Sequence, residues 1–303
     1  MPKKVLISII GPTAIGKTKL AIEIAQYYKT DIISADSRQF YKEMKIGTAV
    51  PTNEELDSAP HHFIQHKSIL EPYTVGDFEK EAISLLDNLF KKKDIVVLVG
   101  GSGLYVDAIT KGFDEFPDIN PEIRIELNKL LEEKGIEVLQ KKLKKLDEKY
   151  YTEVDIENPQ RLVRALEVSI GSGKPYSSYL KKKNIKRPFK TFTIGINAER
   201  EIIYERINKR VDVMMQEGLL EEAKSLVENK ELNALQTVGY KELFKYFDGE
   251  WTLEHAISEI KKNTRRFAKR QMTWFRKNKA TIWVPYNYKI QNAIQAIEDQ
   301  LNE

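Results

Sequence analysis

The sequence Val5-Leu-Ile-Ser-Ile-Ile-Gly-Pro-Thr-Ala-Ile-Gly-Lys-Thr18 contains the glycine-rich loop that decides the fold. Val5–Ile10 is a short run rich in β-branched residues, which predicts a buried strand. Residues 11–18 then match the pattern G-x-x-x-x-G-K-T, and residues 19–28 carry apolar side chains at helical spacing. A strand, this loop and a helix in that order predict a phosphate-binding loop at the start of a helix.

Each part of this loop has a physical role in holding phosphate. The glycines let successive backbone N–H groups point inward at an anion, and the helix N-terminus adds favourable potential. Lys17 adds a positive charge, and the hydroxyl of Thr18 is suited to hold Mg²⁺ on the phosphates. The pattern indicates neither which phosphate compound binds nor which bond breaks. We expect the whole loop to contact phosphate: Gly11, Pro12, Thr13, Ala14, Ile15, Gly16, Lys17 and Thr18.

The composition is that of a globular protein with a large core. The chain has 303 residues, of which 41% are hydrophobic and 31% charged. It has no cysteine, which excludes disulfides and thiolate metal sites. No apolar stretch approaches the length of a membrane span, and the first apolar run is too short for a signal peptide. We expect a monomer in the cytoplasm.

Strands and helices alternate in the first part of the chain. Residues 31–35 and 94–99 are further short apolar runs, and 74–91 has helical spacing. The pattern then becomes helical and charged, until 192–196 returns as a strand. We therefore expect an α/β fold in which 1–114 and 188–303 form a parallel sheet flanked by helices, like that of phosphate-loop NTPases.

A helical insertion is expected over residues 115–187. Helices are predicted over 121–151, with a break near Gly135, and from Asn158-Pro159 to Ile170, where asparagine caps a helix that begins with proline. An apolar leucine stripe spans the first of these segments. A lysine-rich link, 181–187, would end the insertion.

Polar residues follow two of the predicted strands. Asp36 comes directly after the second strand and is interpreted as a general base, a Mg²⁺ ligand or a helix cap. Beside it, Arg38 and Gln39 suit phosphate and base edges. The third strand runs into Gly100-Gly-Ser-Gly103, where Ser102 is either a donor to substrate or part of a structural turn.

Basic residues concentrate near the C-terminus. Nine Lys or Arg against two acidic residues give 251–279 a charge of +7, whereas the whole chain carries +4. In the helix predicted over 253–277, Lys262, Arg266 and Arg270 form one stripe, which is typical of a polyanion-binding surface. The aromatic residues of this helix are interpreted mainly as core. The pair His61-His62 is interpreted as structural or substrate-orienting, because no further metal ligand has suitable spacing.

Arginine pairs occur on two other predicted helices. Gln160, Arg161 and Arg164 lie on the insertion helix, where they either contact a phosphate backbone or pair with Glu157 and Glu167. Arg206 and Arg210 repeat the four-residue spacing, with surface ion pairs as the alternative.

Taken together, these residues resemble the bacterial tRNA dimethylallyltransferase family, also called tRNA isopentenyltransferases. Small departures are Ile15 and Ser102, where that family often has serine and threonine. The resemblance covers almost the whole chain and is carried by the phosphate loop and by Ser34-Ala-Asp-Ser-Arg-Gln-Phe-Tyr41, Ile46-Gly-Thr-Ala49, His61-His62, Val99-Gly-Gly-Ser-Gly-Leu-Tyr105, Asn158-Pro-Gln-Arg161, Arg164-Ala-Leu-Glu167, Val238-Gly-Tyr-Lys-Glu242 and Arg270-Gln-Met-Thr-Trp-Phe-Arg276.

The resemblance implies transfer of a dimethylallyl group from its diphosphate to the N6 amine of the adenine next to the tRNA anticodon on its 3′ side, with Mg²⁺ as cofactor. Asp36 would accept the amine proton, Thr13 would orient the reactants, and Lys17 would stabilise the leaving diphosphate. Arg210, and behind it Arg206, are candidates for a diphosphate contact. The insertion and the basic helix would bind the anticodon stem-loop. Contacts to the tRNA are expected from Asp36, Ser37, Arg38, Gln39, Ser102, Gln160, Arg161 and Arg164.

Three alternatives share the phosphate loop. A small-molecule kinase would release ADP, and an adenylate isopentenyltransferase would modify free adenine nucleotides. An NTP-dependent RNA-binding protein would bind tRNA without changing its mass. The basic surfaces favour a polymeric acceptor.

Overall fold

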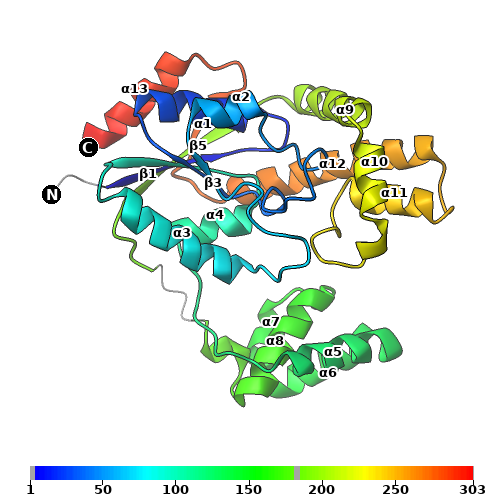
Figure 1. Cartoon of the computed structure of the whole chain (residues 1–303). Helices are drawn as coiled ribbons and strands as arrows, with labels where there is room; N and C mark the ends of the chain where they lie inside the picture. Colours follow the sequence, from blue (N-terminus) through cyan, green and yellow to red (C-terminus); the bar gives the residue numbers. More distant parts are fainter. Residues whose placement is uncertain (1–3, 181–184, 303) are drawn as a thin grey trace. The chain divides into compact units, whose positions relative to one another are not determined.

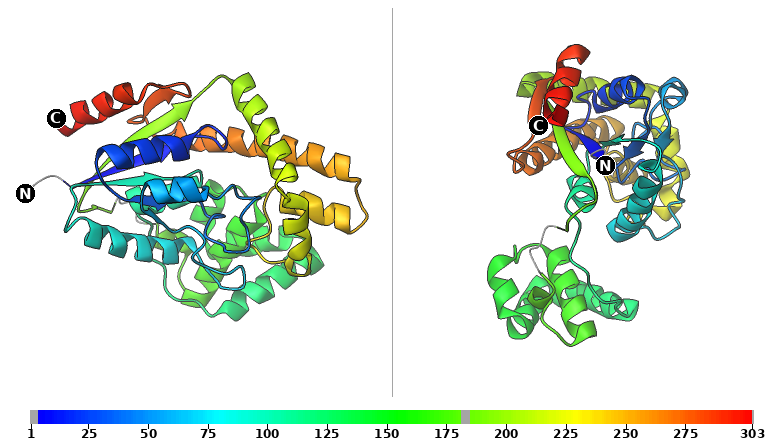
Figure 2. Two further views of the ribbon diagram at one scale, coloured as in Figure 1. Left: turned by 45° about the horizontal axis from the view of Figure 1, so that its top comes forward. Right: turned by 90° about the vertical axis from the view of Figure 1, so that its left-hand side faces the viewer.

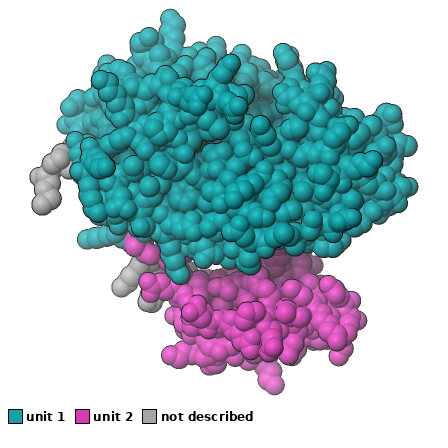
Figure 3. All heavy atoms as spheres, viewed as in Figure 1, with its two compact units in different colours: residues 1–111, 186–303 teal, residues 112–185 magenta. Residues whose placement is uncertain are grey.

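The computed structural model describes residues 4–180 and 185–302 (Figure 1). It divides into two compact units, residues 1–111 with 186–303, and residues 112–185 (Figure 3). The sequence-based boundaries lay at residues 115 and 187. Part of the expected lysine-rich link, 181–184, falls outside the described residues.

The first unit is built on a six-stranded sheet with the order β3-β2-β4-β1-β5-β6, in which every neighbouring pair is parallel. The predicted α/β class is therefore confirmed. The four predicted strands are present, whereas the two edge strands, β3 and β6, were not predicted. The strands are β1 (Val5–Ile10), β2 (Ile32–Ser34), β3 (His61–His62), β4 (Ile95–Val99), β5 (Lys190–Asn197) and β6 (Ile282–Pro285).

Helices cover both faces of this sheet (Figures 1 and 2). Successive side chains of a strand point to opposite faces. Leu6 and Ile10 of β1 accordingly join a core with α3 (Val75–Leu89) and α4 (Gly103–Thr110). Ile7 and Ile9 join the opposite core, with α1 (Lys17–Tyr27) and α13 (Ile290–Asn302). Every residue of β1, including the polar Ser8, is thus buried, and the strand is covered on both sides.

The remaining helices of this unit are α2 (Asn53–Ser58), α9 (Arg200–Gln216), α10 (Leu219–Ser225), α11 (Tyr240–Phe247) and α12 (Leu253–Phe275). Thr52 caps α2 through a reciprocal capping box with Glu55. The long helix α12 packs against α9, α11 and α4, so that it reaches the carboxyl ends of the central strands. Among the described helices, none combines the length and the apolar character needed to cross a bilayer.

At the edge of the sheet, the two histidines of β3 have local partners. His62 Nε2 lies 2.8 Å from an Asp31 carboxylate oxygen, and Asp31 also pairs with Lys93. His61 Nδ1 lies 2.7 Å from the Ala59 carbonyl oxygen. These contacts favour the structural interpretation of the pair.

The second unit contains α5 (Pro121–Lys134), α6 (Ile136–Leu146), α7 (Glu148–Glu153) and α8 (Pro159–Ser172). Asn158 caps α8 and Pro159 begins it, as the sequence predicted. Three leucines of the predicted stripe are buried in the core of this unit, whereas Leu146 is exposed. The break lies at Gly135, whose φ of 76° suits glycine.

One ion pair inside this unit involves a predicted tRNA contact. Arg164 Nη1 lies 2.9 Å from the buried carboxylate of Glu167, which also accepts two hydrogen bonds from Arg124, at 3.0 and 2.7 Å. Burial acts to raise the pKa of Glu167, but the hydrogen bonds from both arginines outweigh it and lower that pKa. Gln160 and Arg161 are exposed on the first turn of α8.

Where the chain returns to the first unit, Arg187 binds the end of α4. Its guanidinium donates to the carbonyl oxygens of Ile109, at 2.9 Å, and Ala108, at 2.5 Å, and it pairs with Glu79. The two connections to residues 112–185 therefore leave the first unit beside each other.

Candidate active site

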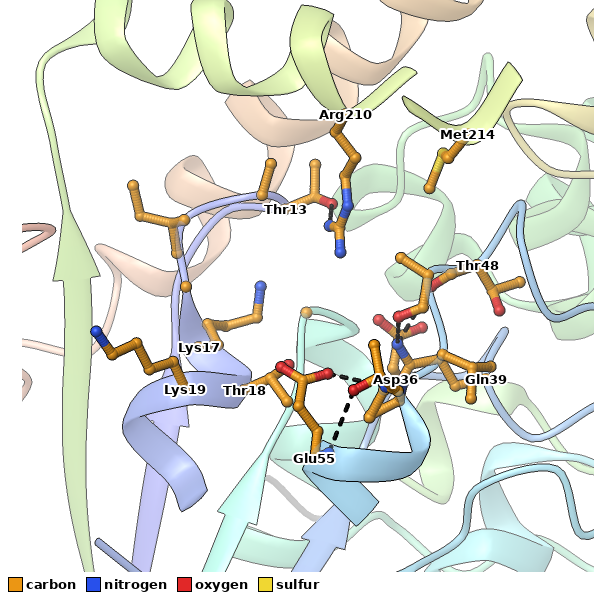
Figure 4. Close-up of a pocket in the computed structure, with 18 of the residues that line it drawn as sticks. Thr13, Lys17, Thr18, Lys19, Asp36, Gln39, Thr48, Glu55, Arg210 and Met214 are labelled. Carbon is orange, nitrogen blue, oxygen red and sulfur yellow. Dashed lines mark hydrogen bonds between the residues drawn. The ribbon is translucent and has the colours of Figure 1, made fainter. Parts of the chain in front are cut away.

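The phosphate loop forms the end of a cavity of about 920 Å³, part of which is drawn in Figure 4. Its backbone is curled: Ala14 has a φ of 63° and Gly16 a φ of 104°. Gly11 must be glycine, because a Cβ there would lie 2.8 Å from the Ile196 carbonyl oxygen. The loop thus has the inward curl that an anion-binding backbone requires.

Positive charge dominates this cavity. Lys17 and Arg210 point into it (Figure 4), and Lys19, Lys45, Arg206 and Lys209 also line it. The acidic lining residues are Asp36, Glu55 and Glu217. An excess of cations in a hollow bordered by protein strongly favours an anionic ligand.

Burial changes the acid–base properties of the two central cations. The pKa of Lys17 is lowered to about 8, first because burial removes water from its ammonium group. The Asp36 carboxylate acts in the opposite direction, and Arg210 lowers the pKa further. Burial likewise lowers the pKa of Arg210. Lys17 Nζ donates to the Pro12 carbonyl oxygen at 2.8 Å, so its charge remains beside the loop.

Thr13 is held by two helices from the far end of the chain. Its backbone N–H donates to Gln271 Oε1 of α12 at 2.9 Å, and Arg210 Nη1 of α9 donates to its hydroxyl at 3.2 Å. Gln271 is buried, and its Nε2 donates to the Gly101 carbonyl oxygen at 2.9 Å. Gln271 therefore ties the phosphate loop to the glycine loop that follows β4.

Asp36 lies opposite the phosphate loop, just after β2. A Cβ placed on Gly101 would lie 3.7 Å from Lys17 Nζ and 3.8 Å from Asp36 Oδ2, so these charged groups converge on Gly101. The other carboxylate oxygen accepts the Arg38 backbone N–H at 3.2 Å. Asp36 is thus oriented by its own loop and remains partly exposed to the cavity.

The side chains that follow Asp36 bind neighbouring loops. Arg38 Nη1 donates to the carbonyl oxygens of Asn233 and Ala234, at 2.8 and 2.9 Å. Gln39 Nε2 donates to the carbonyl oxygens of Thr48, at 3.2 Å, and Ala49, at 2.9 Å. Both residues therefore shape the walls of the site.

Ser37 and Ser102 contact each other next to Asp36. The Ser37 backbone N–H donates to Ser102 Oγ at 3.1 Å, and the two hydroxyl oxygens lie 3.0 Å apart. This contact joins the Asp36 loop to the glycine loop 100–103. The contact gives Ser102 a structural role, whereas its role as a donor to substrate stays a prediction.

A second cavity of about 600 Å³ meets the first. Ser37, Arg38, Ser102, Arg270 and Trp274 line the second cavity only. The phosphate loop contributes only Thr13 to it. The residues shared by both cavities are Thr13, Asp36, Thr48, Ala49, Gly101, Arg210, Met214, Phe267 and Gln271. Asp36 and Thr13 are therefore reached from two sides.

Sequence analysis missed the roles of three residues that line this junction. Gln271 lay in a quoted motif without an assigned role, Met214 carried no signal, and the ring of Phe267 was interpreted as core. Phe267 is 38% exposed and faces both cavities, whereas Phe275 is buried as expected. The spacing could have indicated two of them, because Phe267 and Gln271 lie one turn apart on one face of α12.

The predicted basic stripe of α12 is partly neutralised. Lys262 pairs with Glu259 at 2.7 Å, whereas Arg266 and Arg270 are exposed. Arg270 lies over the Phe267 ring, with its guanidinium carbon 5.7 Å from the ring centroid. Arg206 binds the phosphate loop: its Nε donates to the Ala14 carbonyl oxygen at 2.8 Å.

The fold and sequence match known proteins over almost the whole of this chain. The tRNA dimethylallyltransferase of Flavobacterium johnsoniae is 60% identical over 304 residues, with 98% of each chain covered. The crystal structure of the full-length tRNA isopentenylpyrophosphate transferase from Bacillus halodurans has a TM-score of 0.74 at 37% identity and covers 99% of this chain and 97% of its own. A structure of a eukaryotic dimethylallyltransferase acting on tRNA has a TM-score of 0.82 at 26% identity, covering 99% of this chain and 80% of its own. The profile of the family described as IPP transferase matches residues 39–278, and the chain belongs to this family.

Proposed function

We propose that the protein is a tRNA dimethylallyltransferase, which transfers the dimethylallyl group of dimethylallyl diphosphate to the N6 amine of the adenine that follows the tRNA anticodon. The observation that carries this proposal is the junction of the two cavities at Asp36 and Thr13. One cavity has the phosphate loop and suits a diphosphate, and the other is lined by serine, arginine and aromatic side chains that suit a nucleobase.

The reaction forms one bond and breaks another at the same carbon. The adenine N6 lone pair attacks C1 of the dimethylallyl group, and the C1–O bond breaks with its electron pair leaving on the diphosphate. Lys17, Arg210 and the loop N–H groups would stabilise that charge. Asp36 would accept the N6 proton, a role that typically contributes 10²–10⁴-fold in rate.

The five-carbon group needs apolar contacts between the two reactants. Met214 lies one helical turn beyond Arg210, and Phe267 lies one turn before Gln271. Arg210 and Gln271 both bind Thr13, so each apolar side chain flanks a residue that holds the phosphate loop. Both line the shared part of the cavities, where a dimethylallyl group would cover their exposed surface.

Mg²⁺ is proposed as the cofactor. Among the residues that the structure describes, no three His, Asp or Glu side chains gather into a metal-binding cluster. The hydroxyl of Thr18 lines the first cavity beside the loop and fits an ion that keeps several waters and binds phosphate oxygens. When bound, Mg²⁺ would add further positive charge beside the leaving diphosphate.

The tRNA would deliver its adenine from the side of the second cavity. An adenine stacked in the anticodon loop must turn out of the stack, which costs a few kcal/mol. Exposed Arg266 and Arg270 of α12, and Gln160, Arg161 and Arg164 of the insertion, are proposed to contact the tRNA. Arg164 would do so with the part of its guanidinium that Glu167 does not bind.

The test is a mass measurement on modified tRNA. Unmodified tRNA is incubated with the protein, dimethylallyl diphosphate and Mg²⁺, and its nucleosides are then digested and weighed. The proposal requires one adenosine to gain a five-carbon prenyl group. Unchanged tRNA with prenylated free AMP would instead identify an adenylate isopentenyltransferase. Release of ADP from ATP with a phosphoryl acceptor would identify a kinase.

A further inference from the structure

Residues 45–50 form a loop that lines both cavities. One carboxylate outside the cavities accepts hydrogen bonds from three of its backbone N–H groups. Glu222 of α10 accepts the backbone N–H groups of Lys45 and Ile46 on Oε2, at 2.9 and 2.7 Å. Its Oε1 accepts the Gly47 N–H at 2.8 Å and the Tyr240 hydroxyl at 2.7 Å. Four donors from two distant parts of the chain thus converge on one side chain.

The surroundings hold this carboxylate in one orientation. Tyr240 is fully buried on α11, and a Cβ on Gly47 would lie 2.6 Å from its ring, so Gly47 allows the ring to approach. Burial and the nearby Glu222 raise the pKa of Tyr240, so its hydroxyl keeps its proton and donates. Three successive N–H groups pointing at one anion are an anion-binding concavity, here filled by the protein's own carboxylate.

The contact extends from this loop to the reacting groups. Gln39 Nε2 binds the carbonyl oxygens of Thr48 and Ala49, and the Gln39 N–H donates to the Asp36 carbonyl oxygen at 3.1 Å. Thr48 and Ala49 line both cavities, whereas Glu222 lines neither. Glu222 therefore contacts the loop that lines the site but does not itself line either cavity.

We propose that Glu222 is a positioning residue: its carboxylate sets the place of loop 45–50, and through that loop the width of the junction beside Asp36. This inference rests on the proposed function for its kinetic part. Its structural part, the anchoring of three N–H groups, stands independently. An amide cannot replace a carboxylate that accepts four hydrogen bonds. Its NH₂ group is a donor and cannot accept the hydrogen bonds that the second carboxylate oxygen accepts.

The variant Glu222→Gln tests the anchoring directly. Hydrogen–deuterium exchange of a peptide covering residues 44–48 should become about tenfold faster or more, because charge-assisted hydrogen bonds protect these amides. The neighbouring Glu221→Gln makes the same chemical change on an exposed residue and is the matched control. Tyr240→Phe removes one donor and keeps the ring. It should increase the exchange rate of the same peptide by a smaller factor.

The kinetic readout separates positioning from general damage. With both substrates saturating, the single-turnover rate of Glu222→Gln should fall about 10- to 100-fold, since misplacement of reacting groups by 1 Å costs about that much. Its Kd for dimethylallyl diphosphate should stay within about threefold of the wild-type value, because the phosphate loop is held by Gln271 and Arg210 instead.

Two results would overturn the inference. One is exchange and turnover in Glu222→Gln that match Glu221→Gln. The other is faster exchange throughout the first unit with loss of donor binding, which would show a merely structural role. A wild-type protein that leaves tRNA unmodified would instead remove the proposed function, while the exchange experiment would still decide whether Glu222 anchors the loop.

Discussion

Affinity for dimethylallyl diphosphate should fall as the pH rises above 8, because the phosphate-loop lysine titrates there. Burial, the largest cause, lowers the pKa of Lys17 to about 8, with Asp36 opposing the change and Arg210 adding to it. A diphosphate beside Nζ favours the ammonium form. Binding of the donor should therefore raise the pKa of Lys17 and take up a proton.

The size of the effect follows from the pKa of the free protein. Below pH 8 Lys17 is mostly an ammonium and binds the anion fully, whereas above pH 8 the neutral amine predominates. If only the ammonium form binds, Kd should rise about tenfold between pH 7 and pH 9, and binding at pH 8 should take up about half a proton.

Calorimetric titration with dimethylallyl diphosphate measures both quantities. Titrations in two buffers of different ionisation enthalpy give the proton uptake, and the pH series gives Kd. The control is Lys17→Arg, since a guanidinium stays charged throughout this range. A wild-type Kd that is flat from pH 7 to pH 9, or one that follows the same slope as Lys17→Arg, would refute the assignment.

Three further results are expected. Asp36→Asn should lower the single-turnover rate about 10²–10⁴-fold while changing the Kd for tRNA in filter binding by less than about threefold; equal losses would contradict its role as base. Phe267→Ala should raise the ratio of kcat/KM for geranyl diphosphate to kcat/KM for dimethylallyl diphosphate about tenfold, because removal of the ring opens the junction beside Met214. An unchanged ratio with weaker tRNA binding would instead place the ring against the purine. Glu167→Gln should lower the free energy of unfolding of the insertion by about 1–3 kcal/mol in urea denaturation, since Arg124 loses its charged partner. A loss of stability confined to the sheet unit would contradict this expectation.

The sequence predicted the parts of the fold that have a local cause. The run Val5–Ile10 is buried on both faces, so its β-branched residues signal a strand without knowledge of neighbours. The edge strands lack such a signal. β3 has two residues and pairs beside the contact between His62 and Asp31. β6 packs Trp283 against Gly195 of β5, a fit that exists only after the sheet has assembled.

The candidate site divides in the same way. The phosphate loop and Asp36 belong to short motifs, so they can be recognised from the residues next to them in the sequence. Gln271 reaches Thr13 across 258 residues, and Glu222 reaches Gly47 across 175. No periodicity encodes such pairings, because they depend on how helices pack. Arg38 was expected at a nucleic acid, and its bonds to the Asn233 and Ala234 carbonyl oxygens likewise arise only from tertiary packing.

Arg187 holds together the two ends of the segment 112–185, where the chain leaves and re-enters the first unit. By binding the Ala108 and Ile109 carbonyl oxygens, it fastens the chain's point of return to its point of departure. The entropy cost of closing a segment between two neighbouring ends rises slowly with its length, by about 0.6 kcal/mol for each doubling. The sheet and its phosphate loop can therefore keep their architecture when the segment 112–185 is lengthened or shortened.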